Sequence, residues 1–218
     1  MNHYVAIAGN IGVGKTTITS KISEALGWKA YFEPVIDNPY LDPFYKDMHT
    51  WSFHLQIYFL AKRFESQREI SQSRVSCIQD RTIYEDVEIF ARTLHRQGFM
   101  SPQDFETYHD LFHGMVSYLR PPDMILYLRA NVDELVQRIS SRGREMEKGI
   151  AREYLEELNR SYEGWAERTT KICPVRIIDT VGVDNGADQV AESALAEIRE
   201  HFGLMHLNGQ DDDERVQP

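Results

Sequence analysis

The segment at residues 9–17, Gly-Asn-Ile-Gly-Val-Gly-Lys-Thr-Thr, constrains this chain more than any other stretch of its sequence. It matches the pattern G-x-x-x-x-G-K-[ST], with Gly9, Gly14, Lys15 and Thr16 at the fixed positions. An apolar run precedes the segment and a helical pattern follows it, which is the strand–loop–helix setting of a phosphate-binding loop, or P-loop. In such a loop, backbone N–H groups and the positive end of the helix dipole face phosphate oxygens. The sequence therefore predicts a binding site for a nucleoside triphosphate.

The polar side chains of the loop have separate roles in this chemistry. Lys15 is expected to neutralise the β- and γ-phosphates, and the hydroxyl of Thr16 is expected to ligate Mg²⁺. The residues expected to contact ATP in the loop are Gly9, Asn10, Ile11, Gly12, Val13, Gly14, Lys15, Thr16 and Thr17. The alternative is a glycine-rich turn between a strand and a helix, with a lysine on the surface.

The size and charge of the chain limit what else it can be. Its 218 residues suit one α/β domain, which we expect at residues 1–205, followed by an acidic, disordered tail at 206–218. A formal net charge of −10 argues against general binding of nucleic acid, which needs a basic face. No apolar run has the length of a membrane span, and the first strand starts too early to leave room for a signal peptide. Cys77 and Cys173 are expected as reduced core thiols, which favours the cytoplasm.

Five short runs rich in β-forming residues, at 4–8, 29–32, 75–79, 124–128 and 175–178, alternate with helical patterns. Their apolar residues are consecutive rather than alternating, which is typical of parallel strands buried on both faces. Helices between parallel strands cover both faces of the sheet. We therefore expect an α/β fold with a five-stranded parallel sheet flanked by helices.

The longest helical pattern covers residues 51–73, and its apolar surface is broader than one stripe. Core packing accounts for part of this surface. A contact with the same helix of a second copy would cover more, so we expect a homodimer formed through the long helices. A further pair of helices is expected at 84–97 and 102–119.

Ionisable residues follow two of the expected strands. Glu33 comes after the second strand, and Asp80 and Arg81 come after the third. Ligands of parallel α/β sheets bind beyond the carboxyl ends of the strands, so these residues are expected near the P-loop. An acid in that position can hold Mg²⁺ or accept a proton from an attacking hydroxyl. The alternative is ordinary turn and helix-cap chemistry, especially for Asp80.

Three arginines, Arg138, Arg142 and Arg144, lie close together around Gly143. This spacing suits a mobile lid, at about residues 138–150, that closes over a triphosphate. Guanidinium groups can stabilise the charge that spreads over a phosphoryl group in flight. A solvated helix end would have a similar sequence.

The order and spacing of these motifs resemble the deoxyribonucleoside kinases, and most closely their bacterial deoxyadenosine/deoxyguanosine kinase branch. The resemblance covers residues 4 to about 179. The segments that carry it are the P-loop, Glu33-Pro34-Val35, Trp51-Ser52-Phe53-His54-Leu55-Gln56 with Arg63, Asp80-Arg81-Thr82 with Tyr84 and Asp86, and Arg142-Gly143-Arg144 followed by Glu147-Lys148-Gly149.

The resemblance implies catalytic roles for three residues. Glu33 is expected to contact a nucleoside 5′-hydroxyl and to act as the general base, with Arg81 beside it. Asp80 is expected, with Thr16, at the Mg²⁺ site, and it is the alternative proton acceptor. The family more often has Glu at the position of Asp80, so its metal geometry stays open.

The resemblance also implies a nucleoside site. Tyr45 and Glu147 resemble the pair that binds the sugar 3′-hydroxyl. The amide of Gln56 has one donor and one acceptor for a base edge, which suits N6 and N7 of adenine. The residues assigned to the nucleoside are Glu33, Tyr45, Gln56, Arg63, Arg81, Asp86, Phe90 and Glu147.

Alternatives remain for several of these residues. Arg63 and Asp86 resemble the charged pair of the base site, but could form a structural ion pair. Phe90 resembles the ring that stacks on the base, but could be a core aromatic residue. The residues assigned to ATP outside the P-loop are Arg138, Arg142 and Arg144 of the lid, and Gly182, Val183 and Asp184 of an adenine-binding turn that aligns only loosely.

Together these observations predict a P-loop kinase fold and an Mg²⁺-dependent transfer of the ATP γ-phosphoryl group to the 5′-hydroxyl of a deoxyribonucleoside. Deoxyadenosine is the first expectation, followed by deoxyguanosine and deoxycytidine, with thymidine last. A nucleoside monophosphate kinase is one alternative, although it needs basic residues, rather than Glu33, for its acceptor. A regulatory NTP-binding module is the other alternative.

Overall fold

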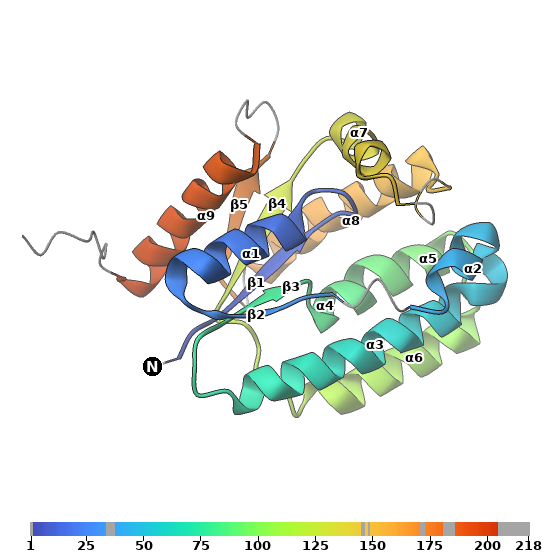
Figure 1. Ribbon diagram of the computed structural model, residues 1–218. Helices are drawn as coiled ribbons and strands as arrows, with labels where there is room; N and C mark the ends of the chain where they lie inside the picture. The colour runs from blue at the N-terminus through green and yellow to red at the C-terminus, as the bar shows by residue number, and fades with distance from the viewer. Residues whose placement is uncertain are drawn as a thin grey trace, which may run out of the picture.

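The computed structural model describes residues 2–33, 38–144, 147, 149–170, 173–180 and 186–204. Within these residues, five strands form one parallel sheet in the order β2-β3-β1-β4-β5 (Figure 1). The strands are β1 (Tyr4–Gly9), β2 (Lys29–Tyr31), β3 (Cys77–Asp80), β4 (Met124–Arg129) and β5 (Val175–Asp179). The predicted five-stranded parallel sheet is confirmed.

The burial of the strands differs between the centre and the edges of the sheet. Every residue of β1 is buried, as the prediction requires. At the edges, Lys29 of β2 and both Arg176 and Ile177 of β5 are exposed. The prediction that all five strands are buried on both faces is therefore wrong for β2 and β5, because each has a neighbouring strand on one side only.

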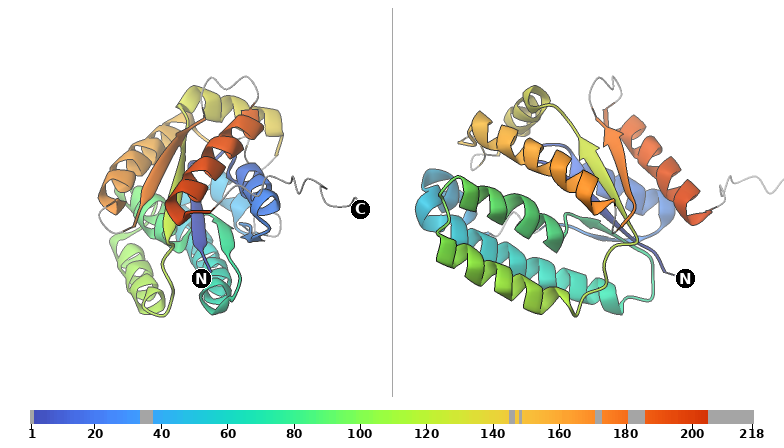
Figure 2. Two further views of the ribbon diagram at one scale, coloured as in Figure 1. Left: turned by 90° about the vertical axis from the view of Figure 1, so that its left-hand side faces the viewer. Right: turned by 180° about the vertical axis from the view of Figure 1, so that it is seen from behind.

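Helices cover both faces of the sheet (Figure 2). One buried cluster joins the sheet to α1, α7 and α9, and a second joins its opposite face to α3, the α4–η1 segment, α6 and α8. The helices are α1 (Lys15–Leu26), α2 (Leu41–Lys46), α3 (Met48–Gln72), α4 (Ile83–Glu85), the π-helical η1 (Asp86–Ala91), α5 (Arg92–Arg96), α6 (Pro102–Val116), α7 (Val132–Arg142), α8 (Arg152–Thr169) and α9 (Gly186–Phe202). The expected three-layer arrangement is confirmed.

Local sequence explains where the helices beside the site begin and end. The side chain of Asn131 accepts a hydrogen bond from the N–H of Glu134 and so caps the start of α7. Gly143 ends α7 with a φ of 66°, a conformation that glycine adopts without strain. Asp47 caps α3 through the N–H of Thr50, so this helix begins three residues before the expected range.

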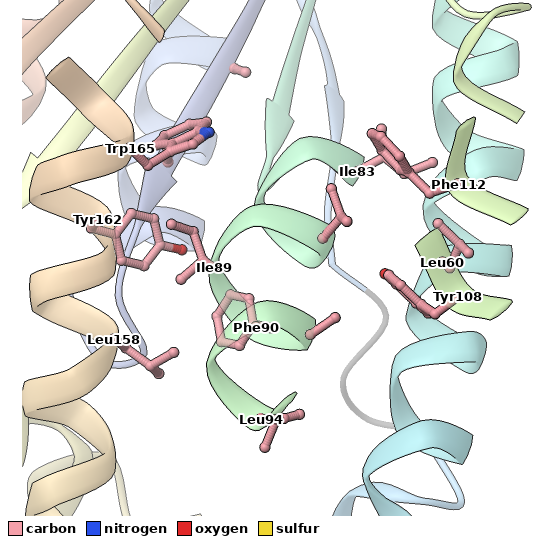
Figure 3. Close-up of a cluster of buried hydrophobic side chains, with 14 of the residues drawn as sticks. Leu60, Ile83, Ile89, Phe90, Leu94, Tyr108, Phe112, Leu158, Tyr162 and Trp165 are labelled. Carbon is pink, nitrogen blue, oxygen red and sulfur yellow. The ribbon is translucent and has the colours of Figure 1, made fainter. Parts of the chain in front are cut away.

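The second helical pair contains a feature that the sequence did not predict. The expected helix at 84–97 is interrupted by η1, in which the turns are wider than in an α-helix. Figure 3 shows Ile89 and Phe90 of this segment between Tyr162 and Trp165 of α8 on one side and Tyr108 and Phe112 of α6 on the other. The packing holds η1 in the centre of the molecule, next to the carboxyl end of β3.

The long helix α3 is buried in part. Its buried positions include four polar residues, Ser52, Gln56, Arg63 and Gln67, and its ring-bearing residues pack only partly against the core. Cys77 and Cys173 are buried free thiols, as expected. Among the residues described, no helix is long and apolar enough to cross a membrane. The expected tail at 206–218 lies outside the described residues.

Candidate active site

A cavity of about 410 Å³ lies at the carboxyl edge of the sheet. It is bordered by the P-loop, α2, α3, the α4–η1 segment and the arginines of the expected lid. The predicted site residues that line it are Ile11, Gly12, Gly14, Lys15, Thr16, Thr17, Glu33, Tyr45, Gln56, Arg63, Arg81, Asp86, Phe90, Arg138, Arg142, Arg144 and Glu147. Gly9, Asn10, Val13 and Asp80 lie behind this wall, and Gly182, Val183 and Asp184 lie outside the described residues.

Two glycines of the P-loop are required by close packing. A Cβ atom at Gly9 would lie 2.7 Å from the carbonyl oxygen of Leu128, and one at Gly12 would lie 2.7 Å from Cγ1 of Ile139. Such distances exclude any side chain, so both positions hold the loop against β4 and α7. Gly12 is not a fixed position of the motif, and the tertiary contact with α7 explains why glycine is needed there.

Lys15 is buried inside the loop. Its Nζ donates to the carbonyl oxygen of Asn10 at 3.0 Å. Burial, aided by the nearby Arg81, lowers the pKa of Lys15 to about 8, although Asp80 and Glu33 oppose this change. A bound triphosphate would supply the negative charge that a buried lysine lacks.

Thr16 and Asp80 meet at the base of the loop. The hydroxyl of Thr16 donates to Oδ2 of Asp80 at 2.6 Å. The other carboxylate oxygen, Oδ1, is buried and has no hydrogen-bond partner among the described residues. Burial raises the pKa of Asp80, against the effect of Lys15. A partnerless carboxylate oxygen beside a P-loop hydroxyl fits Mg²⁺, which commonly uses one or two carboxylates together with phosphate oxygens.

Glu33 lies between two arginines. Its Oε1 accepts from Nη2 of Arg63 at 2.7 Å and lies 3.2 Å from Nε of Arg81. Burial alone would raise the pKa of Glu33, but Arg81, Arg63 and Lys15 outweigh burial and bring it to about 2. Glu33 is therefore ionised at neutral pH, with its charge directed into the cavity that the P-loop lines.

Arg63 connects this acid to a second one. Its Nε donates to Oδ2 of Asp86, at the start of η1. Burial raises the pKa of Asp86 to about 6, although Arg63 lowers it. The ion pair that was one interpretation of these residues is present, and both partners also line the cavity.

The far end of the cavity has mostly apolar walls. Leu41, Phe44, Leu55 and Phe59 contribute to them. Among these apolar groups, the amide oxygen of Gln56 is buried and has no hydrogen-bond partner in the described part of the chain. An unpaired buried amide costs about 1–3 kcal/mol, so a ligand with a hydrogen-bond donor would be favoured here.

Phe90 also lines the cavity. Its ring centre is 4.4 Å from the guanidinium of Arg81, which is a cation–π contact. The ring therefore supports Arg81 in the structure, and its stacking on a base stays a prediction.

The three lid arginines are held in two different ways. Arg138 donates to the carbonyl oxygens of Val13 and Thr180, to the hydroxyl of Thr180 and to Glu134. It thus fastens α7 to the P-loop, and its contact with phosphate stays a prediction.

Arg142 and Arg144 both form ion pairs with Glu147, the second at 3.2 Å. The structure therefore brings the expected phosphate-binding pair together with the acid expected to bind the sugar. Tyr45 lines the same cavity from α2, a helix that the sequence did not predict.

Besides the apolar wall residues, sequence reasoning missed two buried residues behind the cavity, Glu85 and Tyr162. Glu85 has no exposed surface and accepts hydrogen bonds from the N–H of Thr82 at 2.8 Å and from the hydroxyl of Tyr162 at 2.8 Å. The spacing of Thr82 and Glu85 is that of a helix capping box, a signal that was readable. For Tyr162 the sequence has only helical spacing, which predicts burial and no specific partner.

A P-loop with a buried lysine, a partnerless acid beside it and a carboxylate held by arginines across one cavity define the class of protein, a P-loop kinase. Residues 5–202 match the family model described as deoxynucleoside kinase, and the chain belongs to this family. The resemblance found in the sequence is confirmed, and the protein is a phosphotransferase.

Curated relatives of this chain include deoxyadenosine, deoxycytidine and deoxyguanosine kinases. The deoxyadenosine/deoxycytidine kinase of Bacillus subtilis is 42% identical over 201 residues, which cover 87% of this chain and 92% of that protein. The deoxyadenosine kinase of Dictyostelium discoideum is 39% identical over 94% of this chain and 83% of its own length. A solved structure of deoxyadenosine kinase from M. mycoides with the products dCMP and dCDP has a TM-score of 0.82 at 32% identity, covering 90% of this chain and 99% of that one.

Proposed function

We propose that this protein is an Mg²⁺-dependent kinase that transfers the γ-phosphoryl group of ATP to the 5′-hydroxyl of a deoxyribonucleoside, as a salvage reaction. One observation carries the proposal: a single cavity holds the P-loop and an ionised Glu33 that two arginines keep in place. A carboxylate in that position suits an uncharged alcohol as the acceptor and repels a phosphate.

The residues around the phosphates have complementary tasks. Backbone N–H groups of the P-loop and Lys15 bind the triphosphate, and Thr16 and Asp80 would hold Mg²⁺. When bound, the metal ion neutralises negative charge on the phosphate oxygens. Arg142 and Arg144 stabilise the transferring phosphoryl group after they leave Glu147.

Glu33 acts on the acceptor. Its carboxylate accepts a hydrogen bond from the 5′-hydroxyl and orients the oxygen toward the γ-phosphorus. The 5′-oxygen forms a bond to that phosphorus, the bond to the oxygen bridging the β- and γ-phosphates breaks, and the proton of the hydroxyl passes to Glu33. Asp80 already accepts a hydrogen bond from Thr16 of the P-loop, so we assign the role of proton acceptor to Glu33.

The base and sugar occupy the opposite end of the cavity. We assign Gln56, Arg63 and Asp86 to the edge of the base, with Phe90 against its face. Tyr45 and Glu147 bind the 3′-hydroxyl. The unpaired oxygen of Gln56 supports adenine, whose N6 amino group is a donor, and the name of the B. subtilis relative supports deoxyadenosine first. Cytosine and guanine also have donor amino groups, so the order of the other two candidates rests on the name of the B. subtilis relative, which supports deoxycytidine second and deoxyguanosine third.

A panel of acceptors tests the proposal. Purified protein with ATP and Mg²⁺ is incubated with each of the four deoxyribonucleosides and with deoxyadenosine monophosphate, and the products are separated by chromatography. We expect deoxyadenosine to give its monophosphate and the monophosphate to be left unchanged. Phosphorylation of the monophosphate alone would indicate a nucleoside monophosphate kinase. ATP hydrolysis that is independent of nucleosides would indicate a regulatory module.

We also propose a homodimer through α3 and α6. Leu111 of α6 is 43% exposed, and Tyr118, just beyond this helix, is 81% exposed. Tyr118→Arg should therefore produce monomers, as measured by light scattering after size-exclusion chromatography. A wild-type protein that is monomeric at all concentrations would refute this assembly.

The buried free thiols support a cytoplasmic location. We also propose that residues 1–205 act as one kinase domain.

A further inference from the structure

Arg81 has an unusual backbone conformation. Its φ is 66°, and it is the one non-glycine residue with positive φ in the part of the chain that the structure describes. For an L-residue this left-handed conformation costs about 1–2 kcal/mol. The N–H of Arg81 donates to the carbonyl oxygen of Ile7 at 3.0 Å, so the reversal occurs directly at the carboxyl end of β3. This turn allows the guanidinium to reach Glu33.

The carboxylate of Glu85 lies behind this turn and contacts three separate segments. Its Oε2 accepts from the N–H of Thr82, the residue after Arg81. Its Oε1 accepts from the N–H of Gly9, the first residue of the P-loop, at 3.3 Å, and from the hydroxyl of Tyr162 on α8. One buried side chain therefore joins the turn at Arg81, the P-loop and α8.

Tyr162 extends this connection to the side chain of Arg81. Its hydroxyl donates to Glu85 and accepts from Nη1 of Arg81 at 2.6 Å. The same Nη1 lies 3.5 Å from Oε1 of Glu85. In Figure 3 the hydroxyl of Tyr162 points from α8 toward the α4–η1 segment. The guanidinium of Arg81 is thus supported from behind by Glu85 and Tyr162 while it holds Glu33 in front.

In the described residues, the groups hydrogen-bonded to Glu85 are all donors, and a carboxylate is the side chain that only accepts. We propose that Glu85 is a positioning residue for phosphoryl transfer, which stabilises the strained turn at Arg81 and fixes the distance from its guanidinium to the P-loop. This inference rests on the proposed function. Glu85 itself is fully buried and is not among the residues that line the cavity.

A purely structural interpretation is that Glu85 caps α4 through the capping box with Thr82. The cap uses Oε2, and it does not explain why Oε1 accepts from Gly9 and Tyr162. The Glu85→Gln variant separates the two roles. An amide oxygen can still cap Thr82, whereas its NH₂ group would face the N–H of Gly9 and the hydroxyl of Tyr162, both of which are donors in the structure.

The experiment compares three variants with the wild-type protein at saturating ATP and Mg²⁺. Glu85→Gln should lower kcat about 10- to 100-fold and leave the KM for the nucleoside within about threefold, because other elements bind the base and sugar. Tyr162→Phe should lower kcat less than Glu85→Gln does. The double variant should be no slower than Glu85→Gln, because both changes disrupt the same hydrogen bond between Tyr162 and Glu85. Glu88→Gln is the matched control, because it removes a partly exposed carboxylate paired with Arg92 in the same helical segment, and its kcat should equal that of the wild type.

Two results would overturn the inference. One is a kcat within about twofold of wild type for folded Glu85→Gln and Tyr162→Phe, which would leave Glu85 as a cap only. The other is a rise in KM with unchanged kcat. If Glu85→Gln does not fold by circular dichroism, Tyr162→Phe decides alone, because the capping box remains intact in it. Failure of the proposed function is distinct, since the wild-type protein would then phosphorylate no deoxyribonucleoside.

Discussion

Replacing Glu33 by Gln keeps the size of the side chain and removes its charge. We expect Glu33→Gln to lower kcat about 10²- to 10⁴-fold, the usual contribution of a general base, while nucleoside binding is retained. Arg63 keeps its contact with Asp86, and Arg81 keeps its contact with Tyr162, so neither guanidinium is left unpaired. The variant should therefore fold.

The structure also gives a magnitude for the stability of this variant. Its neighbours bring the pKa of Glu33 from 4.5 to about 2. At 1.36 kcal/mol per pKa unit, this shift means that the folded state favours the ionised carboxylate by about 3 kcal/mol. A neutral amide lacks this stabilisation. Because the folded pKa is lowered, this stabilisation is present above pH 4.5 and is lost as the pH falls toward 2. The free energy of unfolding of Glu33→Gln should therefore approach that of the wild type in acid.

Two measurements decide the case. Formation of the monophosphate is followed by chromatography at saturating nucleoside, and unfolding in urea is followed by circular dichroism at pH 7 and pH 3. Asp42→Asn is the control, because this exposed acid pairs with Lys46 on the surface of α2, and it should retain wild-type kcat. A kcat for Glu33→Gln within about threefold of wild type would remove Glu33 from the mechanism.

Three further predictions concern the rest of the cavity. Lys15→Met should lower kcat at least about 100-fold. It should not lower the melting temperature, because burial already disfavours the charged form of Lys15 in the folded protein, and a lower melting temperature would contradict this reasoning. Gln56→Leu should raise the KM for deoxyadenosine about 10-fold or more with little change in unfolding, and an unchanged KM would exclude Gln56 from base recognition. Asp86→Asn should be more destabilising at pH 4 than at pH 7, measured by urea unfolding. The reason is that a folded pKa raised to about 6 stabilises the wild type below pH 3.8 and this contribution is lost as the pH rises through 6.

The parts of the site that the sequence predicted are local or lie at strand ends. The P-loop is one continuous motif, and Glu33 and Arg81 are close because parallel strands end at one edge of the sheet. The limits of β3 were less accurate, since the expected strand began at Val75, which is 56% exposed, whereas the structure begins it at Cys77.

The contacts that the sequence did not predict depend on the packing of distant segments. Tyr162 of α8 meets Arg81 across 81 residues of chain, and no spacing rule connects them. Gly12 accommodates Ile139 of α7, which a motif cannot indicate. The π-helical turns of η1 also arise from tertiary packing, because the sequence of this segment is compatible with an ordinary α-helix.

The two ion pairs of Arg63, with Asp86 and with Glu33, have a practical consequence for redesign. Its two nitrogens hold Asp86, which we propose for the base, and Glu33, which we propose for catalysis, so in the proposed mechanism one guanidinium serves both selectivity and turnover. Exchanging Arg63 to admit another base would also release Glu33 from one of its two cations. Libraries aimed at new nucleoside analogues should therefore keep Arg63, together with Phe59, whose ring centre lies 5.4 Å from its guanidinium, and vary the apolar wall around Leu41 and Leu55.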